Sequence, residues 1–189
     1  GQRRRSLTPA RLEPRDVPKL QATVCILARD FLESRGFADE VGQRRVVLNA
    51  LSICNLYLEK CTDGAGSCQW SGLRVALDHY SARGISACAV ISGQFARRYG
   101  SMLPSDLWSK AVVCLDFDKC FGDLMLIELA KRLNCQFVDN LRCVAYPVSI
   151  MTAEAASWLQ ENHSELKVEF DFTSSGVFIP NEPAEFVEI

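Results

Sequence analysis

The chain has no long hydrophobic run, only two histidines and no glycine-rich phosphate loop, and each absence excludes a class of protein. No uninterrupted apolar stretch in its 189 residues approaches the ~20 residues that a membrane-spanning helix needs. The histidines are His79 and His163, and no two of the nine cysteines have the Cys-x-x-Cys spacing of common zinc sites. Residues 63–66 lack the spacing and context of a P-loop or a dinucleotide-binding turn. We therefore expect no membrane association, no structural zinc and no nucleotide cofactor.

The nine cysteines have the sequence context of free thiols. Most of them, including Cys25, Cys54, Cys88, Cys114 and Cys135, lie in apolar runs where a small hydrophobic residue would serve equally well. This pattern is typical of proteins in a reducing compartment. We expect an intracellular protein, located in the cytoplasm or in an organelle such as the mitochondrion.

Charge is unevenly distributed, although the net charge is only −2. Residues 1–16 contain five arginines and two acids, whereas residues 154–189 contain one lysine and eight acids. A basic arm of this kind indicates contact with an anionic partner. The alternative is a solvated terminus without a partner.

Helical and strand patterns alternate along most of the chain. Leu20, Val24, Leu27 and Phe31 recur at helical spacing after Pro18, which favours an amphipathic helix that ends near Gly36. Residues 53–60 are ambiguous. The expected helices are 17–35, 71–84, 122–133 and 153–161, and the expected strands are 45–48, 87–91, 111–115, 135–138 and 168–172.

This order predicts an α/β fold with three layers, in which helices flank a mainly parallel sheet of about five strands. Residues 111–115 are apolar without alternation, as in a strand covered on both faces, while residues 168–172 alternate like a half-exposed edge strand. We expect four regions along the chain: a basic arm at 1–16, a helix and connector at 17–44, one domain at 45–183 and an acidic tail at 184–189.

Polar residues follow each predicted strand. Parallel strands end at the same edge of a sheet, where ligands of α/β proteins gather. Clustered carboxylates there would favour Mg²⁺, which can generate hydroxide and stabilise phosphoryl oxygens. The alternative is that these residues are helix caps and solvated loop ends. The residues are Asn49, Ser52, Ser92, Asp116, Asp118, Asp139 and Asn140, with Asp123 at the start of the next helix.

Five segments between residues 45 and 183 resemble, in the same order, the Regnase-type branch of the NYN/PIN-like ribonucleases. These segments are Arg45-Val46-Val47-Leu48-Asn49-Ala50-Leu51-Ser52, Trp70-Ser71-Gly72-Leu73 with its helix, Ala111-Val112-Val113-Cys114-Leu115-Asp116, Phe137-Val138-Asp139-Asn140, and residues 168–183. The resemblance implies a PIN-like (Rossmann-like) fold and cleavage of single-stranded RNA with Mg²⁺ or Mn²⁺. It implies catalytic roles for Asp116, Asp118, Asp123 and Asp139, of which Asp116, Asp123 and Asp139 would hold the metal.

The acidic site of this family is only partly present. Its first carboxylate falls on Asn49. Its paired aspartates are spread over residues 116–118 or, if the extra residues form an insertion, fall on Gly122 and Asp123. Its last carboxylate falls on Leu141 or, with a slip in register, on Asp139. One unit charge pair at ~4 Å is worth about 4 kcal/mol at an effective dielectric constant near 20. An amide at position 49 should therefore leave metal binding weak or absent.

Basic residues could bind the phosphates of RNA, which gives affinity without sequence readout. Trp70, Tyr99 and Trp108 could stack on bases, although such residues more often pack in a core. The basic residues that we expect to contact RNA are Arg3, Arg4, Arg5, Arg97, Arg98, Lys110 and Lys119.

Three functions are compatible with this sequence. The first is a catalytically degenerate nuclease domain that acts as an RNA-binding or structural component of a ribonucleoprotein, with RNA or protein partners. The second is an active Mg²⁺-dependent endoribonuclease. The third is a protein-interaction adaptor that uses the acidic C-terminal stretch and the helix at 17–35.

Overall fold

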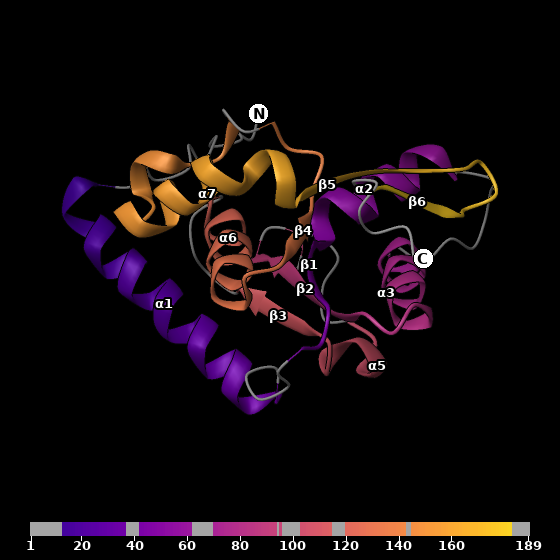
Figure 1. Cartoon of the computed structure of the whole chain (residues 1–189), viewed down its shortest axis with the longest axis horizontal. Coiled ribbons are helices and arrows are strands. Elements are labelled where there is room, and N and C mark those ends of the chain that lie inside the picture. The colour runs from indigo at the N-terminus through magenta and orange to yellow at the C-terminus, as the bar shows by residue number, and fades with distance from the viewer. Residues whose placement is uncertain are drawn as a thin grey trace, which may run out of the picture.

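A computed structural model describes residues 13–36, 42–61, 70–93, 95, 103–114, 120–142 and 145–182. Helices cover both faces of a six-stranded sheet with the order β3-β2-β1-β4-β5-β6 (Figure 1). The elements are η1 (Pro14–Asp16), α1 (Val17–Ser34), β1 (Arg45–Asn49), α2 (Ala50–Lys60), α3 (Ser71–Ala82), β2 (Ser86–Ser92), α5 (Ser105–Trp108), β3 (Ala111–Cys114), α6 (Phe121–Leu133), β4 (Gln136–Val138), η3 (Val148–Ile150), α7 (Ala153–Leu166), β5 (Lys167–Phe172) and β6 (Phe178–Asn181).

The first five strands are parallel, and β6 pairs antiparallel with β5. The predicted three-layer, mainly parallel fold is therefore confirmed. The expectation that residues 168–172 form an edge strand is wrong, because β6 pairs with the far side of β5 and is itself the edge strand. The turn that returns β6 passes through Gly176, whose φ of +84° is a conformation that glycine adopts at low cost. One face of β5 is still exposed, which explains its alternating sequence.

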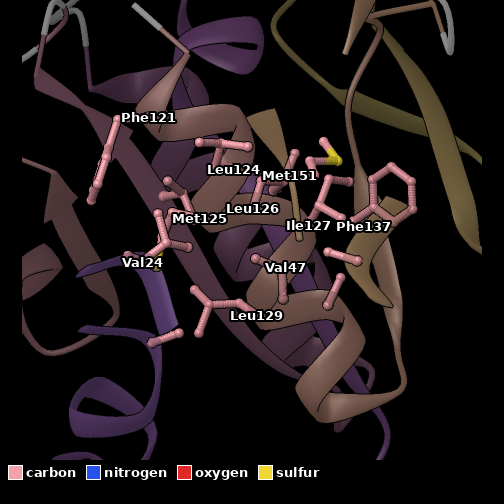
Figure 2. Close-up of a cluster of buried hydrophobic side chains, with 14 of the residues drawn as sticks. Val24, Val47, Phe121, Leu124, Met125, Leu126, Ile127, Leu129, Phe137 and Met151 are labelled. Atoms are coloured by element: carbon pink, nitrogen blue, oxygen red, sulfur yellow. The ribbon is translucent and has the colours of Figure 1, made fainter. Parts of the chain in front are cut away.

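The core lies on both faces of the sheet. On one face, α1, α6 and α7 pack over Val47, Cys88 and Phe137, and Figure 2 shows the side chains gathered around α6. On the other face, α2 and α3 cover Val46 and Leu48. Since successive residues of β1 point to opposite faces, this strand contributes to both halves of the core.

Helix α1 buries a slightly different stripe from the one predicted. Leu20, Val24 and Phe31 are buried, but Leu27 is 38% exposed and Ala28 is fully covered instead. The small side chain of Ala28 allows α1 to lie close against α6. Ala28 therefore takes the buried position of the stripe that was predicted for Leu27. The ambiguous residues 53–60 belong to α2, and α7 continues to Leu166, five residues beyond its predicted end.

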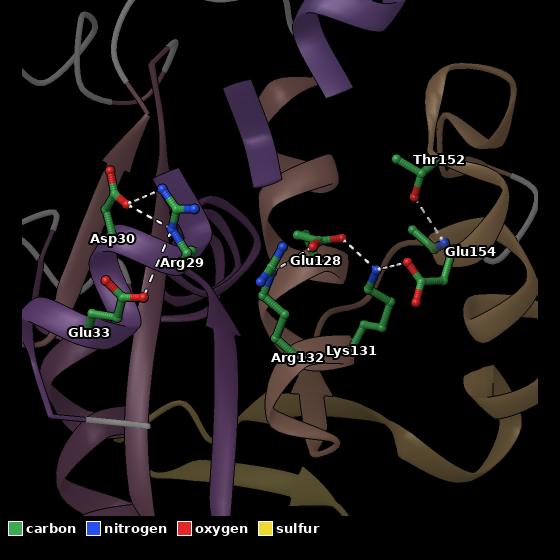
Figure 3. A network of polar contacts seen from close by, with 9 residues as sticks. Arg29, Asp30, Glu33, Glu128, Lys131, Arg132, Thr152 and Glu154 are labelled. Atoms are coloured by element: carbon green, nitrogen blue, oxygen red, sulfur yellow. Dashed lines mark hydrogen bonds and ion pairs between the residues drawn. The ribbon is translucent and has the colours of Figure 1, made fainter. Parts of the chain in front are cut away.

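An ion-pair network around the buried Glu128 reaches from α6 to α7 (Figure 3). Glu128 is 2% exposed and lies 2.7 Å from Arg132 Nε and 3.1 Å from Lys131 Nζ, and Lys131 also reaches Glu154 of α7 at 3.1 Å. Thr152 caps the start of α7 by accepting a hydrogen bond from the Ala155 N–H at 3.1 Å. The Lys131–Glu154 ion pair thus connects α6 to the first turn of α7.

Three of the cysteines lie in the core as reduced thiols. Cys54, Cys88 and Cys135 are buried free thiols, and burial raises the pKa of Cys88 to about 12. Within the described part of the chain, no helix combines the length and the apolarity needed to cross a bilayer.

Candidate carboxylate site at the end of the strands

Three neighbouring strands and one helix bring polar side chains to the carboxyl edge of the sheet. Strand β1 ends at Asn49, β2 ends at Ser92, and Asp139 follows β4 directly. Helix α6 begins against the end of β2, where a Cβ on Gly122 would lie only 3.0 Å from the Ser92 Cβ. Glycine at this position therefore allows the close approach that places Asp123 in the first turn of α6, at the same edge.

Asp139 is the central carboxylate of this edge and has no exposed surface. Its Oδ1 accepts a hydrogen bond from Ser52 Oγ of α2 at 2.5 Å and another from the Leu141 N–H at 3.2 Å. Its Oδ2 accepts from the Tyr146 hydroxyl at 2.8 Å. Both carboxylate oxygens are thus satisfied within the protein, and Asp139 joins β4, α2 and the segment before α7.

Asn49 uses its side-chain oxygen to cap α2. Its Oδ1 accepts from the N–H groups of Leu51 at 3.1 Å and Ser52 at 3.3 Å, which is the usual geometry of an asparagine N-cap. The amide is neutral, and its oxygen is engaged by the helix backbone. Asn49, which the sequence resemblance aligns with a carboxylate, therefore contributes local helix stability but no negative charge.

The pKa of the Asp123 carboxyl is higher than the ordinary value of an aspartate. Burial and, to a smaller extent, the negative charge of Asp139 raise the pKa of Asp123 to about 7. No hydrogen bond or ion pair joins its side chain to another described residue. Near neutral pH a large fraction of this carboxyl is therefore protonated, which lowers the negative charge of the edge further.

The described donors supply only part of a magnesium site. Asp123 and Asp139 lie at one edge, but no group of three His, Cys, Asp or Glu side chains that could hold a metal is found among the described residues. Mg²⁺ prefers an octahedral shell of oxygen ligands, and Asp139 is enclosed by its own hydrogen bonds. Asp116 and Asp118 lie outside the described residues. Of the predicted metal ligands, the structure therefore locates only Asp123 and Asp139.

Two other polar residues at strand ends have structural roles. The Asn140 amide pairs with the backbone of Phe170, donating to its C=O and accepting from its N–H, each at 3.0 Å. It thereby continues the pairing of β5 beyond the short strand β4. Ser92 Oγ accepts from the Phe95 N–H at 3.4 Å.

Tyr146 is the site residue that sequence reasoning missed. It reaches Asp139 from seven residues further along the chain, through a segment without regular spacing. A buried tyrosine hydroxyl usually has a hydrogen-bond partner, but sequence alone does not say which one.

The structure describes only some of the residues that were predicted to contact RNA. Lys110 lies before β3, at the amino edge of the sheet. Trp70 is 1% exposed and packs edge-on against Phe95 with 4.9 Å between ring centroids, so it belongs to the core and cannot stack on a base. Trp108 is 49% exposed. Arg3, Arg4, Arg5, Arg97, Arg98, Tyr99 and Lys119 lie outside the described residues.

Comparison with known proteins identifies similar folds but no sequence family. No family model matches the chain, and no curated protein matches it. Among solved structures, it is similar to the crystal structure of nuclear proteinaceous RNase P 2 (PRORP2) from A. thaliana, with a TM-score of 0.54, 14% identity and coverage of 92% of this chain. A second structure, Arabidopsis thaliana nuclear protein-only RNase P 2 (PRORP2), gives a TM-score of 0.55, 15% identity and 93% coverage.

Both structures are of PRORP2, and this chain spans 37% and 38% of the chains in them, well under half of their length. At this identity the likeness shows the fold alone. It agrees with the three-layer α/β arrangement and mainly parallel sheet that the sequence predicted.

Proposed function

We propose that this chain is a PIN/NYN-like nuclease domain, of the Regnase type, that has lost efficient hydrolysis and binds RNA as a component of a ribonucleoprotein. The observation that carries this proposal is the state of the carboxyl edge. Its central carboxylate, Asp139, is buried and satisfied by protein donors, and the position expected to hold a second carboxylate is the capping amide of Asn49.

The charge balance explains why hydrolysis should be lost. A divalent cation that loses one carboxylate ligand at ~4 Å loses up to about 8 kcal/mol of attraction at an effective dielectric constant near 20, as an upper bound. The raised pKa of Asp123 removes part of another charge near neutral pH. The hydroxyls of Ser52 and Tyr146 stabilise Asp139 in place of a cation, so the edge is stable without one.

Two observations support the RNA-binding part of the proposal. The fold is similar to that in two structures of one protein, whose name identifies it as a protein-only RNase P. The sequence also places Arg3, Arg4 and Arg5 in a basic arm, and Lys110 is available on the folded domain. Cations of this kind bind a phosphate backbone without sequence preference.

An active Mg²⁺- or Mn²⁺-dependent endoribonuclease is the second candidate, and the pKa of Asp123 is the observation that favours it. Two carboxylates that repel one another in a partly buried site are the arrangement that a bound cation relieves. Asp116 or Asp118 would have to complete the ligand set.

A cleavage assay separates the two candidates. Purified protein is incubated with a labelled unstructured RNA and Mg²⁺ or Mn²⁺, beside Asp123→Asn and the matched variant Asp78→Asn. Asp78 is exposed on α3, which runs toward the amino edge, so its loss removes the same charge far from the site. We expect the wild-type protein to cleave no more RNA than the Asp123→Asn variant does. Cleavage that Asp123→Asn loses and Asp78→Asn retains would establish the active nuclease instead.

A binding assay tests the RNA partner. We expect the protein to bind the same RNA at low salt, with an affinity that falls steeply as salt increases. If the protein binds no RNA at low salt, the adaptor function replaces the one proposed.

A further inference from the structure

Helix α1 covers the core with one side only. Figure 1 shows α1 along the outer margin of the molecule, where it packs on α6. Its buried residues are Leu20, Val24, Ala28, Phe31 and Leu32. At about 100° of turn per residue, Ile26 lies almost directly opposite this buried stripe, and it is 48% exposed. A large aliphatic side chain is therefore placed at the outermost point of the helix, away from the core.

The residues around Ile26 form a continuous stripe on the outer side of α1. All of them lie within about 60° of Ile26 around the helix axis, and all are exposed or half-exposed. The centre of the stripe is apolar or small, and its ends are charged. We call this set the outer stripe, and its members are Lys19, Ala22, Thr23, Ile26, Arg29, Asp30 and Glu33.

The composition of the outer stripe favours a protein partner. Its two cations and two acids cancel, so the stripe has no positive surplus that would attract nucleic acid or an anionic membrane surface. Leu27, which is 38% exposed, lies beside Ile26 and extends the apolar centre. Six large hydrophobic side chains are exposed in the described part of the chain, and two of them are these neighbours on α1.

The charges of the outer stripe are complementary to the same stripe on a second copy. Lys19 lies seven residues before Ile26, and Glu33 lies seven residues after it. An antiparallel second copy of α1, with Ile26 on the two-fold axis, therefore places Lys19 of each copy opposite Glu33 of the other. Lys19 makes no ion pair with any residue that the structure describes, and the one ion pair of Glu33 is with Arg29, at 3.9 Å. A parallel copy would instead oppose like charges.

Helix geometry allows these contacts to form together. In the antiparallel arrangement, Ala22 and Thr23 of one copy face Asp30 and Arg29 of the other, so small side chains leave room for long ones. At a rise of 1.5 Å per residue, each charged end lies about 10 Å from the two-fold axis. Two helices that cross at about 20° are displaced sideways by only about 4 Å at that distance. Lysine and glutamate side chains can span such a displacement.

From this self-complementary pattern we infer that two copies of this chain associate through the outer stripe of α1, as an antiparallel two-fold dimer. The inference is independent of the proposed RNA-binding function, because it uses no residue of the carboxyl edge. A contact between two single helices is smaller than the ~1,200 Å² at which stable interfaces begin. The dimer is therefore weak, with a Kd on the order of 10–100 μM.

Sedimentation velocity at low salt, with protein from about 5 to about 300 μM, covers this range of Kd. The wild type should shift from monomer to dimer as the concentration rises. Ile26→Asp should weaken dimerisation at least about tenfold, because it places two carboxylates face to face at the axis. The matched variant Val177→Asp adds the same charge at a 56% exposed position of the turn before β6, far from α1 in Figure 1, and should dimerise like the wild type.

A charge exchange tests the antiparallel arrangement. Lys19→Glu and Glu33→Lys should each weaken dimerisation about threefold to tenfold, because each opposes like charges at both ends of the contact. An equimolar mixture of the two variants should dimerise like the wild type. In that mixed dimer, one copy supplies acids at both ends and the other supplies lysines at both ends.

Each outcome supports or overturns the inference. A wild type that stays monomeric up to about 300 μM overturns it and leaves a different protein as the partner of this face. Dimerisation that Ile26→Asp leaves unchanged overturns the outer stripe as the contact. A mixture that dimerises no better than the single variants overturns the antiparallel arrangement. Circular dichroism of each variant identifies any loss of helix, and a restored mixture shows in addition that both of its components are folded.

Discussion

Replacing Asp123 by asparagine should stabilise the protein at pH 8 and have a smaller effect at pH 5. In the folded protein, burial and the charge of Asp139 raise the pKa of this carboxyl to about 7, from an ordinary value of 3.8. The folded protein therefore binds this proton more tightly than the unfolded chain does. The resulting stability is fully present below pH 3.8 and is lost as the pH rises through 7. Asparagine has nearly the same shape but no charge, so the variant escapes this loss.

The magnitude follows from the two pKa values. Each tenfold change in proton affinity is worth about 1.4 kcal/mol, which gives an upper bound of about 4 kcal/mol at pH 8. About 2.5 kcal/mol of this bound develops between pH 5 and pH 8. Because Asp123 is only partly buried, solvent screens it, and we expect about half of these values.

Urea unfolding of wild type and variant at several pH values measures the difference. Titrating groups that do not interact with Asp123, including the two histidines, contribute equally to both proteins and cancel. Asp78→Asn is the matched control, because it removes an exposed carboxyl of α3 far from this edge. If Asp123→Asn gains no stability at pH 8, or gains the same amount at pH 5 and pH 8, the electrostatic description of the edge is wrong.

Three further substitutions test the packing around the site through the free energy of unfolding. Tyr146→Phe leaves an oxygen of the buried Asp139 without its donor, which should cost about 1–3 kcal/mol. Asn140→Ala removes both hydrogen bonds to the backbone of β5 and should cost about 1–3 kcal/mol. Gly72→Ala places a Cβ 2.5 Å from the Tyr57 Cβ, so α2 and α3 must separate. This overpacking should cost about 1–3 kcal/mol.

Each of these substitutions has a control of the same chemical type. Tyr57→Phe removes a hydroxyl that makes no hydrogen bond with the described residues, Asn55→Ala changes an exposed position of α2, and Ser71→Ala changes the position before Gly72. The controls should shift stability by less than about 0.5 kcal/mol. An equal loss in a variant and its control would show that the contact in question contributes nothing specific.

Most of the fold could be predicted because burial on one or both faces leaves a periodic pattern. The apolar stripe of α3 and the unbroken run at 111–115 predicted their elements correctly. Strand β6 could not be predicted, because its four residues include Pro180, which is uncommon inside a strand. Its place at the edge depends on pairing with β5, and that pairing is a tertiary contact.

The candidate site was predictable only to the level of topology. Strand order predicts that Asn49 and Asp139 lie at one edge, because both follow parallel strands. The directions of their side chains depend on local hydrogen bonds. Asn49 turns to the start of α2, and the hydroxyl of Tyr146 reaches Asp139 from a segment without a repeating pattern. Such contacts depend on the path of the chain between elements, which residue spacing does not specify.

The central claim is that the carboxyl edge no longer holds a catalytic divalent cation, and calorimetric titration of the protein with Mn²⁺ near neutral pH tests it most directly. Mn²⁺ serves as the probe because it accepts the same oxygen ligands as Mg²⁺. We expect no binding tighter than a Kd of ~1 mM, which corresponds to about −4 kcal/mol. A micromolar Kd that Asp123→Asn abolishes and Asp78→Asn preserves would contradict the claim.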